Sequence, residues 1–581
     1  MAQALTELQQ KQIQQAEELL FSGPQKDGFA KDLFLGKFRS QSMLPYPELP
    51  ESLRQRGDEI VARVRDYCDN HIDADSIDRD ARIPDDVVTG LGEIGVLGAT
   101  VAPEHGGLGL LQQTYCRIME VIGSHCGSTA VFVNAHHSIG LRGLELFGSD
   151  EQKLRWVKPL AAGDQMAAFA LTEPEAGSDA SNVQTRAEPT EDGSGFIVNG
   201  EKRWITNGGI ADLLTLMVRT PDDKEPEGRI TALLVTPDMP GFEVVEERME
   251  KVGIRGTATG RLRFTNMFVP RENILGPYGG GLRVALTVLN FGRTTFGASC
   301  TGAAKFCVER MVHRANNRRQ FGKSLGEFEL VQSKLAEAAA DTYSMESATY
   351  HTAALIDSGA SDYMVETAML KVFASDTLWR IVNDTLQVWG GAGFFTDQPF
   401  ERMMRDARLN QIGEGANDVL RCFIAMVGFR GLGEQLQGVL KKPWTVHRML
   451  RLAPAVPCEP PRLQPFASQL GKQIAKFTWA AQRSLIRYRE SVLDRQYVQA
   501  ALGDVATELF TASCVYSRLC SLMKNTSIDD QRRDRELQTG IMALKLAFRR
   551  NQQRLATLKR NDDDARTRTA ESWLATGETK I

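Results

Sequence analysis

The chain has 581 residues, of which 42% are hydrophobic, 24% charged and 7% aromatic, and this composition is typical of a folded globular protein rather than a disordered or collagen-like one. Its formal net charge is −4, from 69 basic and 73 acidic residues, so no overall cationic field points to a nucleic-acid partner. Nine scattered cysteines without a CxxC pair argue against a disulfide framework or a zinc site, and for a reducing compartment.

The beginning of the chain is not typical of a targeting signal. MAQALTELQQKQIQQAEELL is polar, contains three glutamates and lacks arginine, unlike a secretory or mitochondrial signal. No apolar run approaches the roughly 18 residues that span a bilayer. The sequence therefore predicts a cytoplasmic enzyme, with peripheral attachment to the inner membrane face as an alternative.

The order of apolar patterns predicts helices, then strands, then helices, which is an α+β fold that is mostly α. Ile60, Val64 and Tyr67 follow helical spacing, whereas FIVNGEKRWITNGG and LRFTNMFV are β-rich runs between turn residues. We expect five parts: an N-terminal extension (1–45), an N-terminal helical domain (46–165), a middle antiparallel β-barrel-like domain (166–281), a helical bundle domain (282–430) and an extra C-terminal helical domain (431–581).

The last part reads as a small helical bundle. Leu470, Ile474 and Phe477 recur at helical spacing, and such apolar stripes have to be buried against one another. The segment KKPWTVHRMLR (441–451) has four cations, no acid and a tryptophan. This pattern suits a peripheral membrane contact, and it suits an ordinary basic linker at least as well.

Two familiar motifs are excluded. Gly322-Lys323-Ser324 resembles the end of a phosphate loop, but Asn317 stands where the partner glycine would be. His136 and His137 are adjacent and cannot share one helix face as metal ligands at i and i+4 would, so we interpret them as structural or pocket-lining residues.

Three stretches carry residues typical of a binding site. LTEPEAGSD (171–179) offers hydroxyl groups and backbone amides around Gly177, and WITNGG (204–209) presents an indole beside a threonine. A capped β-turn and a buried hairpin core are the corresponding structural alternatives. In the third stretch, 387–421, paired glycines allow backbone to approach a ligand, and Glu414 lies between two glycines.

These stretches resemble the acyl-CoA dehydrogenase family. LTEPEAGSD is similar to the family's first signature, and WITNGG, NRRQFG (317–322) and EGANDVLR (414–421) are further family blocks in family order. FLGKFRSQSMLPYP (34–47) and the helical extension beyond residue 430 are most similar to the very-long-chain subgroup. The second signature fits at every spacing, through Gln387, Gly390, Gly391, Gly393, Phe394, Asp397, Arg402 and Asp406.

The resemblance implies FAD as the cofactor. Thr172 would hydrogen-bond the flavin ring, Trp204 would shield one of its faces and Thr206 would lie near N5. Arg318 would reach the FAD pyrophosphate across the interface of a homodimer. The full set of expected cofactor-binding residues is Phe169, Leu171, Thr172, Gly177, Ser178, Trp204, Ile205, Thr206, Arg318, Gln332, Gln387, Val388, Gly390, Gly391, Ala416, Asn417 and Asp418.

Glu414 matches the family's catalytic base. It would remove the α-proton of an acyl-CoA thioester, of long chain by the subgroup resemblance, while the β-hydrogen leaves as hydride to flavin N5 and trans-2-enoyl-CoA forms. The expected substrate-binding residues are Ser178, Asn290, Arg293 and Gly415. VLNFGRTTF (288–296), where a few relatives carry their base, contains no acid, and an electron-transfer flavoprotein would accept the electrons.

Several positions depart from the family pattern. Gly413 replaces a common aromatic residue and Ala416 a threonine, while Ala130 and Asn134 stand where long-chain relatives have glycines that deepen the acyl pocket. Two alternatives stay open. One is an acyl-CoA oxidase that uses O2, and the other is an assembly or scaffold protein of low activity that keeps the flavoprotein fold.

Overall fold

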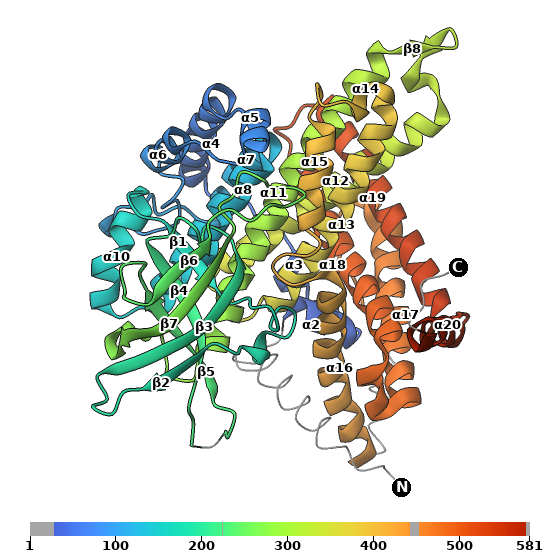
Figure 1. Cartoon of the computed structure of the whole chain (residues 1–581). Helices are drawn as coiled ribbons and strands as arrows, with labels where there is room; N and C mark the ends of the chain where they lie inside the picture. The colour runs from blue at the N-terminus through green and yellow to red at the C-terminus, as the bar shows by residue number, and fades with distance from the viewer. Residues whose placement is uncertain (1–27, 224, 442–452, 577–581) are drawn as a thin grey trace. The chain divides into compact units, whose positions relative to one another are not determined.

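The computed structural model describes residues 28–223, 225–441 and 453–576. Its contacts divide the chain into two compact units, one containing Pro47–Asn417 and the other Asp27–Tyr46 with Asp418–Ile581 (Figure 1). The mostly helical α+β fold expected from the sequence is confirmed, and the main sheet of the described residues comes from the middle of the chain.

The first unit begins with helices that cover one another through apolar faces. Val64 and Cys68 of α4 pack with Val87 and Leu91 of α6 in one core. A reciprocal capping box between Ser149 and Gln152 starts α10. The helices are α4 (Glu51–His71), α5 (Ala74–Asp80), α6 (Asp85–Glu93), α7 (Gln112–His125), α8 (Gly127–Val133), the π-helix η2 (Asn134–Leu141), α9 (Arg142–Phe147) and α10 (Asp150–Ala162).

The middle of the first unit is a seven-stranded sheet with strand order β1-β4-β2-β3-β7-β6, and β5 pairs with β4. The pairing is mostly antiparallel, but β1 runs parallel to β4, so the sheet is mixed. Both faces of β4 are buried. The strands are β1 (Ala167–Ala170), β2 (Arg186–Pro189), β3 (Gly195–Ile205), β4 (Leu213–Thr220), β5 (Arg229–Val235), β6 (Phe242–Glu246) and β7 (Gly260–Pro270).

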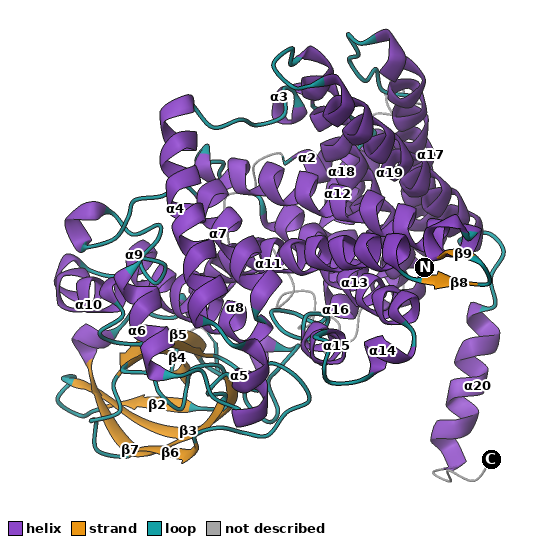
Figure 2. Cartoon of the chain, turned by 90° about the horizontal axis from the view of Figure 1, so that it is seen from above, coloured by secondary structure: helices purple, strands orange, loops and turns teal. Residues whose placement is uncertain are grey.

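The helix α11 (Gly281–Asn317) runs through the middle of the helices of the first unit, where it packs on α7, α12 and α13, and the sheet lies toward one of its ends (Figure 2). Close approach to α7 requires glycine, since a Cβ at Gly302 would lie 1.9 Å from the carbonyl oxygen of Glu120. The other elements are β8 (Arg319–Gln320), β9 (Lys323–Ser324), α12 (Glu329–Asp357), α13 (Met364–Trp389), α14 (Gly391–Phe394) and α15 (Phe400–Leu409).

The second unit is a helical bundle built on the apolar stripes found in the sequence. The described part of the N-terminal segment packs into this bundle, because Phe34 contacts Phe477 edge-to-face at 4.7 Å. Thr478 also donates a hydrogen bond to the carbonyl oxygen of Leu33. The helices are α2 (Phe29–Phe34), α3 (Ser40–Met43), α16 (Asn417–Lys441), α17 (Gln464–Tyr488), α18 (Gln496–Lys524), α19 (Asp530–Thr557) and α20 (Asp563–Thr576).

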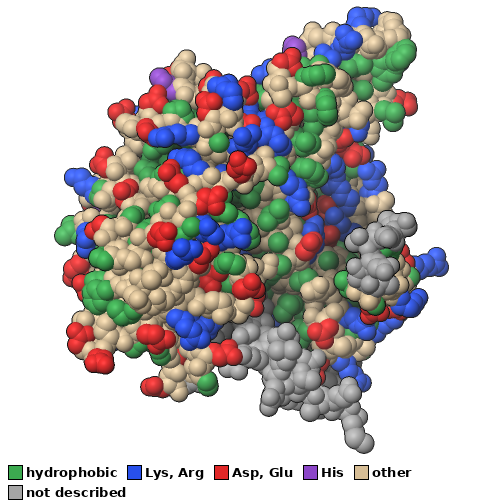
Figure 3. All heavy atoms as spheres, viewed as in Figure 1, with side chains coloured by type: hydrophobic (Ala, Val, Ile, Leu, Met, Phe, Trp, Pro, Cys, Tyr) green, Lys and Arg blue, Asp and Glu red, His purple; other side chains and the backbone are tan. Residues whose placement is uncertain are grey.

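The distribution of charged and apolar side chains in the described residues is the one expected from the near-neutral, globular composition. Acidic and basic side chains are interspersed over the face seen in Figure 3. Among the described residues, none of the helices is both long enough and apolar enough to span a bilayer. The basic segment 441–451 lies outside the described residues apart from the backbone of Lys441.

Candidate functional site

Glu414 lies on the loop between α15 and α16, and its backbone is held in a conformation that non-glycine residues rarely adopt. Its φ is +56°. Arg293 of α11 donates from Nε to the Glu414 carbonyl oxygen at 3.2 Å. Lys371 of α13 donates from Nζ to the next carbonyl, that of Gly415, at 2.7 Å. Two cations on neighbouring helices therefore fix the peptide groups that orient the Glu414 side chain.

The two oxygens of the Glu414 carboxylate have different surroundings. Oε1 accepts a hydrogen bond from Nδ2 of Asn134 at 2.5 Å. Oε2 is buried and has no hydrogen-bond partner. It lies over Gly292 of α11, where an added Cβ would be only 2.7 Å away and would push the carboxylate out of this position. One oxygen is thus tethered, and the other is free to accept a proton.

Burial raises the pKa of Glu414 to about 7, although the nearby cations Arg293 and Lys371 and the Asn134 amide favour the ionised form. Burial also lowers the pKa of Arg293 to about 10 and that of Lys371 to about 8. A carboxylate with a pKa near neutrality is suited to act as a general base, because a useful fraction is ionised while it still binds a proton strongly.

The predicted substrate residues on α11 gather around this carboxylate. Asn290 is buried and accepts hydrogen bonds from Thr367 at 3.0 Å and from Arg293 at 3.5 Å. Arg293 therefore links Asn290 to the Glu414 backbone. Ser178, the remaining predicted substrate residue besides Gly415, lies exposed in the loop after β1.

The first signature and WITNGG lie together at the end of β3. The backbone N–H of Arg203 donates to the carbonyl oxygen of Thr172 at 2.9 Å. Asn207 donates from Nδ2 to the carbonyl oxygen of Phe132 in α8 at 3.1 Å. Since Asn134 comes two residues after Phe132, these bonds place the WITNGG turn beside the helix that contacts Glu414.

The surface formed by these segments fits a flat cofactor such as FAD. Trp204 has φ +60° and is 53% exposed, which is unusual for an indole at the end of a buried strand. Thr172 is half-buried, and a Cβ at Gly177 would meet no atom within 4 Å, so backbone groups there are open to a ligand. Phe169, Leu171 and Ile205 pack beneath this surface.

A second group of predicted cofactor residues lies at the other end of α11. Arg318 follows the helix directly, while Gln332 and Gln387 are exposed nearby on α12 and α13. Gly390 has φ +64°, and a Cβ at Gly390 or Gly391 would project into open space. Val388 is buried. At 1.5 Å per helical residue, Arg318 lies roughly 37 Å from Arg293. Within one chain these residues and Glu414 are therefore not brought together.

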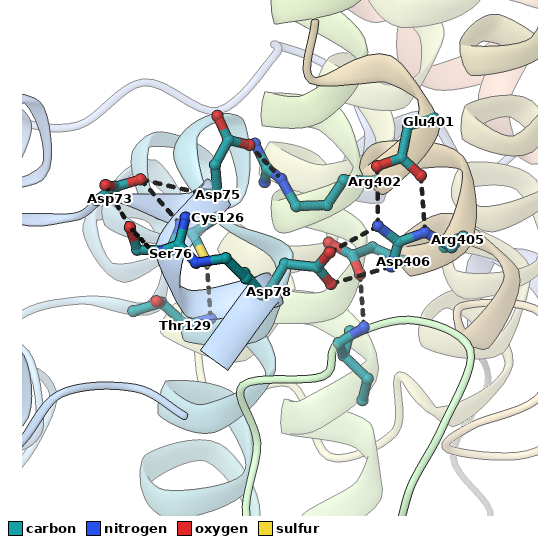
Figure 4. Close-up of polar contacts among 12 residues, drawn as sticks. Asp73, Asp75, Ser76, Asp78, Cys126, Thr129, Glu401, Arg402, Arg405 and Asp406 are labelled. Carbon is teal, nitrogen blue, oxygen red and sulfur yellow. Dashed lines mark hydrogen bonds and ion pairs between the residues drawn. The ribbon is translucent and has the colours of Figure 1, made fainter. Parts of the chain in front are cut away.

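Two residues of the second signature, Arg402 and Asp406, hold α15 in place. Arg402 donates to Asp75 of α5 at 3.0 Å, and Oδ1 of Asp406 accepts from the backbone N–H of Ile254 at 2.5 Å (Figure 4). Burial raises the pKa of Asp406 to about 6. Arg405 binds both Asp78 and Glu401. This network anchors the helix that leads into the Glu414 loop.

The residues after Glu414 act mainly on the loop itself. The Asn417 side chain donates to Ser375 and Asp376 and accepts from Lys371, so it ties the loop to α13. Ala416 is half-buried. Asp418 is exposed and pairs with Arg421 at 3.3 Å.

Sequence reasoning missed three supporting residues. Lys371 is fully buried in the middle of an apolar helix. A single cation among apolar residues in the sequence could have indicated this buried lysine. Glu173 and Lys202 form a buried ion pair of 2.6 Å beneath the first signature. Asn134 was considered only for pocket depth. The buried His136 forms hydrogen bonds with the backbone of Leu160 and Ala167, and the buried His137 forms one with the backbone of Thr100. Both histidines are therefore structural.

A narrow cavity of about 40 Å³ follows α11 beyond Gly292. Phe296 and Ala303 line it from α11, and Ala130 and Val131 line it from α8. Apart from Ser299, Asp406 and Asn410 its lining is apolar, but it is far smaller than the roughly 300–1,000 Å³ of a ligand pocket.

Family models match most of the chain. The N-terminal, middle and C-terminal domains of acyl-CoA dehydrogenases match residues 55–164, 168–267 and 279–429. The ACAD9/ACADV C-terminal domain matches residues 461–574.

Relatives and solved structures agree with these matches. The very long-chain specific acyl-CoA dehydrogenase of Bos taurus is 34% identical over 84% of this chain and 78% of its own length. An acyl-CoA dehydrogenase from Bacillus anthracis, solved complexed with FAD, superposes with a TM-score of 0.81 at 27% identity over 91% of both chains. A chain from work on the electron transferring flavoprotein of Acidaminococcus fermentans has a TM-score of 0.61 at 32% identity, over 66% of this chain and 98% of its own.

Proposed function

The chain belongs to the acyl-CoA dehydrogenase family as an FAD-dependent enzyme, and we propose that it converts a long-chain acyl-CoA thioester to trans-2-enoyl-CoA with Glu414 as the base. The observation that supports this most directly is the free, buried Oε2 of Glu414, whose carboxyl pKa lies at about 7.

In the proposed reaction the chain's own residues bind the thioester and move one proton. Oε2 of Glu414 takes the α-proton, and the electron pair of that C–H bond forms the new double bond. Bound FAD supplies the acceptor for the β-hydrogen with its electron pair. Arg293 and Lys371 hold the loop through its carbonyl groups, so the carboxylate stays aimed while its charge is neutralised.

Long-chain substrates are supported by the similarity to very-long-chain relatives. Gly413 beside the base meets only Leu409, with its nearest atom 3.7 Å from an added Cβ, so a larger side chain would fit there and glycine leaves extra room. Asn134, in η2, stands where long-chain relatives have a glycine that deepens the acyl pocket. The length and branching of the acyl chain that the enzyme accepts therefore depend on the side chains at positions 413 and 134.

The test is anaerobic mixing of the yellow holoprotein with acyl-CoA thioesters of short, medium, long and branched chains. We expect bleaching of the flavin absorbance, fastest with long chains. Absence of bleaching with every thioester would contradict the proposed function and favour the scaffold alternative.

The electron acceptor is proposed to be an electron-transfer flavoprotein, as the family resemblance implies. An oxidase is the competing function, because nothing near Glu414 separates the two. Oxygen consumption under turnover, compared with reduction of a flavoprotein or artificial one-electron acceptor, decides between them.

We also propose a homodimer in which Arg318 serves the partner's cofactor. The support is that Arg318 lies roughly 37 Å along α11 from Arg293, at the exposed end that also carries Phe321, which is 94% exposed. A second copy could bring this end to the site that its own chain cannot reach.

Mixed dimers test this arrangement. Arg318→Ala and Glu414→Gln homodimers are each expected to be nearly inactive. Dissociated and mixed, they should recover about a quarter of wild-type activity, since half of the random dimers are hybrids with one intact site. No recovery on mixing, with hybrids demonstrated by mass spectrometry of tagged subunits, would place Arg318 in its own chain's site.

A cytoplasmic location and a peripheral membrane contact rest on sequence alone. Co-sedimentation with anionic vesicles, before and after neutralising the cations of 441–451, would test the membrane contact.

A further inference from the structure

A chain of buried hydrogen bonds leads from α7 to the Glu414 carboxylate. The hydroxyl of Tyr115 lies 3.1 Å from Oγ of Ser138, which lies 3.0 Å from Oγ1 of Thr295. Thr295 bonds Oδ1 of Asn134, and Nδ2 of Asn134 bonds Oε1 of Glu414 at 2.5 Å. These residues come from α7, η2 and α11, and the chain ends on the loop after α15.

The bonds in this chain have one favoured direction. Oδ1 of Asn134 can only accept, so Thr295 donates its single hydroxyl proton to it. Ser138 then donates to Thr295, and Tyr115 donates to Ser138. If Thr295 instead donated to the carbonyl of Phe291 or Gly292, Oδ1 of Asn134 would be left buried without a donor, which is costly. Every donor therefore points toward the carboxylate.

The four neutral members of the chain are almost completely buried. Thr295 is 0% exposed, Tyr115 and Ser138 are 1% exposed, and Asn134 is 2% exposed. In such surroundings each bond polarises the next, and a donor chain that ends on an anion is strengthened by it. Asn134 and Ser138 both belong to the π-helix η2. π-Helical segments within α-helices occur frequently at functional sites.

We propose that Asn134 is a positioning residue for the base: its amide, held by Thr295, Ser138 and Tyr115, tethers Oε1 of Glu414 and leaves Oε2 as the oxygen that takes the α-proton. This inference rests on the proposed function. It explains why a polar amide is buried in η2.

The tether also has an electrostatic consequence. The charged and titratable groups facing Glu414 are Arg293 and Cys300 on α11, Lys371 on α13 and Tyr115 on α7. The Asn134 hydrogen bond acts in the same direction as the two cations and lowers the pKa of Glu414 against the effect of burial. Removing it should raise that pKa, so more of the base is protonated at neutral pH.

The experiment compares Asn134→Ala, Thr295→Val and Thr295→Ser with wild type in the holoprotein. The rate of flavin bleaching by a long-chain acyl-CoA is measured at pH values below and above 7. Protonation of Glu414 is measured separately, from the infrared band of its protonated carboxyl group in the difference between each protein and Glu414→Gln. For Asn134→Ala we expect the acid limb, which is the fall of the bleaching rate as pH decreases, to lie about one pH unit higher. We also expect its bleaching rate at high pH to be about 10- to 100-fold lower than that of wild type.

The Thr295 pair tests whether the rest of the chain matters. Thr295→Val keeps the side-chain shape without the donor and should shift the acid limb in the same direction by less, whereas Thr295→Ser should restore it. Asn273→Ala is the matched control, because Asn273 is buried in the β-domain and donates to the Leu234 carbonyl away from Glu414.

Two results would overturn the proposal. One is an Asn134→Ala holoprotein, normal in flavin content, with wild-type rate and acid limb. The other is a Glu414 infrared titration whose midpoint is the same in Asn134→Ala and Thr295→Val as in wild type. If Asn134→Ala does not fold, the titration of Thr295→Val alone decides. Failure of the proposed function is separate, since wild type itself would then not bleach while the infrared titration could still respond.

Discussion

Glu414→Gln is expected to lower the rate of flavin bleaching by long-chain acyl-CoA about 10³-fold or more, within the range that a general base contributes. The substitution is nearly isosteric, and the glutamine carbonyl can still accept the Asn134 bond. The buried Oε2 position then holds an amide that cannot take a proton. The measurement is stopped-flow absorbance of the holoprotein under anaerobic conditions.

Flavin content serves as the control, because the Glu414 side chain contacts Asn134 and Gly292 and its replacement should leave the yellow cofactor bound. Glu414→Asp keeps a carboxylate but withdraws it by one methylene, so an intermediate rate is expected. In wild type, kcat/KM should fall as pH drops through about 7, since protonation removes the base. Unchanged bleaching by Glu414→Gln would show that another group takes the proton.

The arrangement of the fold could be predicted because its signals are local. Apolar residues at helical spacing, such as Leu470, Ile474 and Phe477, are buried as the period requires. The parallel pairing of β1 with β4 could not be predicted, since it joins strands more than 40 residues apart. For the same reason the sequence did not reveal that Phe34 packs on Phe477 across the length of the chain.

The site was predictable where a motif carries it and not where partners come from distant segments. Glu414 was found through EGANDVLR, but its tether Asn134 lies 280 positions away and Lys371 is hidden in a helix. Spacing also cannot separate a residue that faces a ligand from one that holds a helix. Arg402 and Asp406 belong to a signature, yet the structure gives them ion-pair and backbone partners.

Breaking the buried ion pair between Lys202 and Glu173 is expected to cause the largest loss in the free energy of unfolding. Lys202 is 0% exposed and Glu173 is 2% exposed, and the pair spans 2.6 Å. Lys202→Met leaves a buried carboxylate without its cation, and removal of one partner from such a pair costs about 3–5 kcal/mol. Denaturant unfolding of the flavin-free protein measures this loss directly.

The same substitution should also weaken flavin retention, because the pair supports the surface predicted to hold the cofactor. Lys202 donates to the Leu171 carbonyl, and Glu173 accepts from the backbone N–H groups of Gln184 and Thr185. Arg263→Met is the matched control in the same sheet, since Arg263 pairs with Glu243 at the surface and should cost at most about 1 kcal/mol.

A second variant separates the lost partner from the lost packing. Glu173→Gln combined with Lys202→Met removes both charges, so part of the stability should return if an unpaired carboxylate is the cause. Burial alone would raise the pKa of Glu173, but Lys202 and the backbone donors keep it below its ordinary value. If the double variant is as unstable as Lys202→Met and holds flavin no better, the pair acts through packing and not through charge.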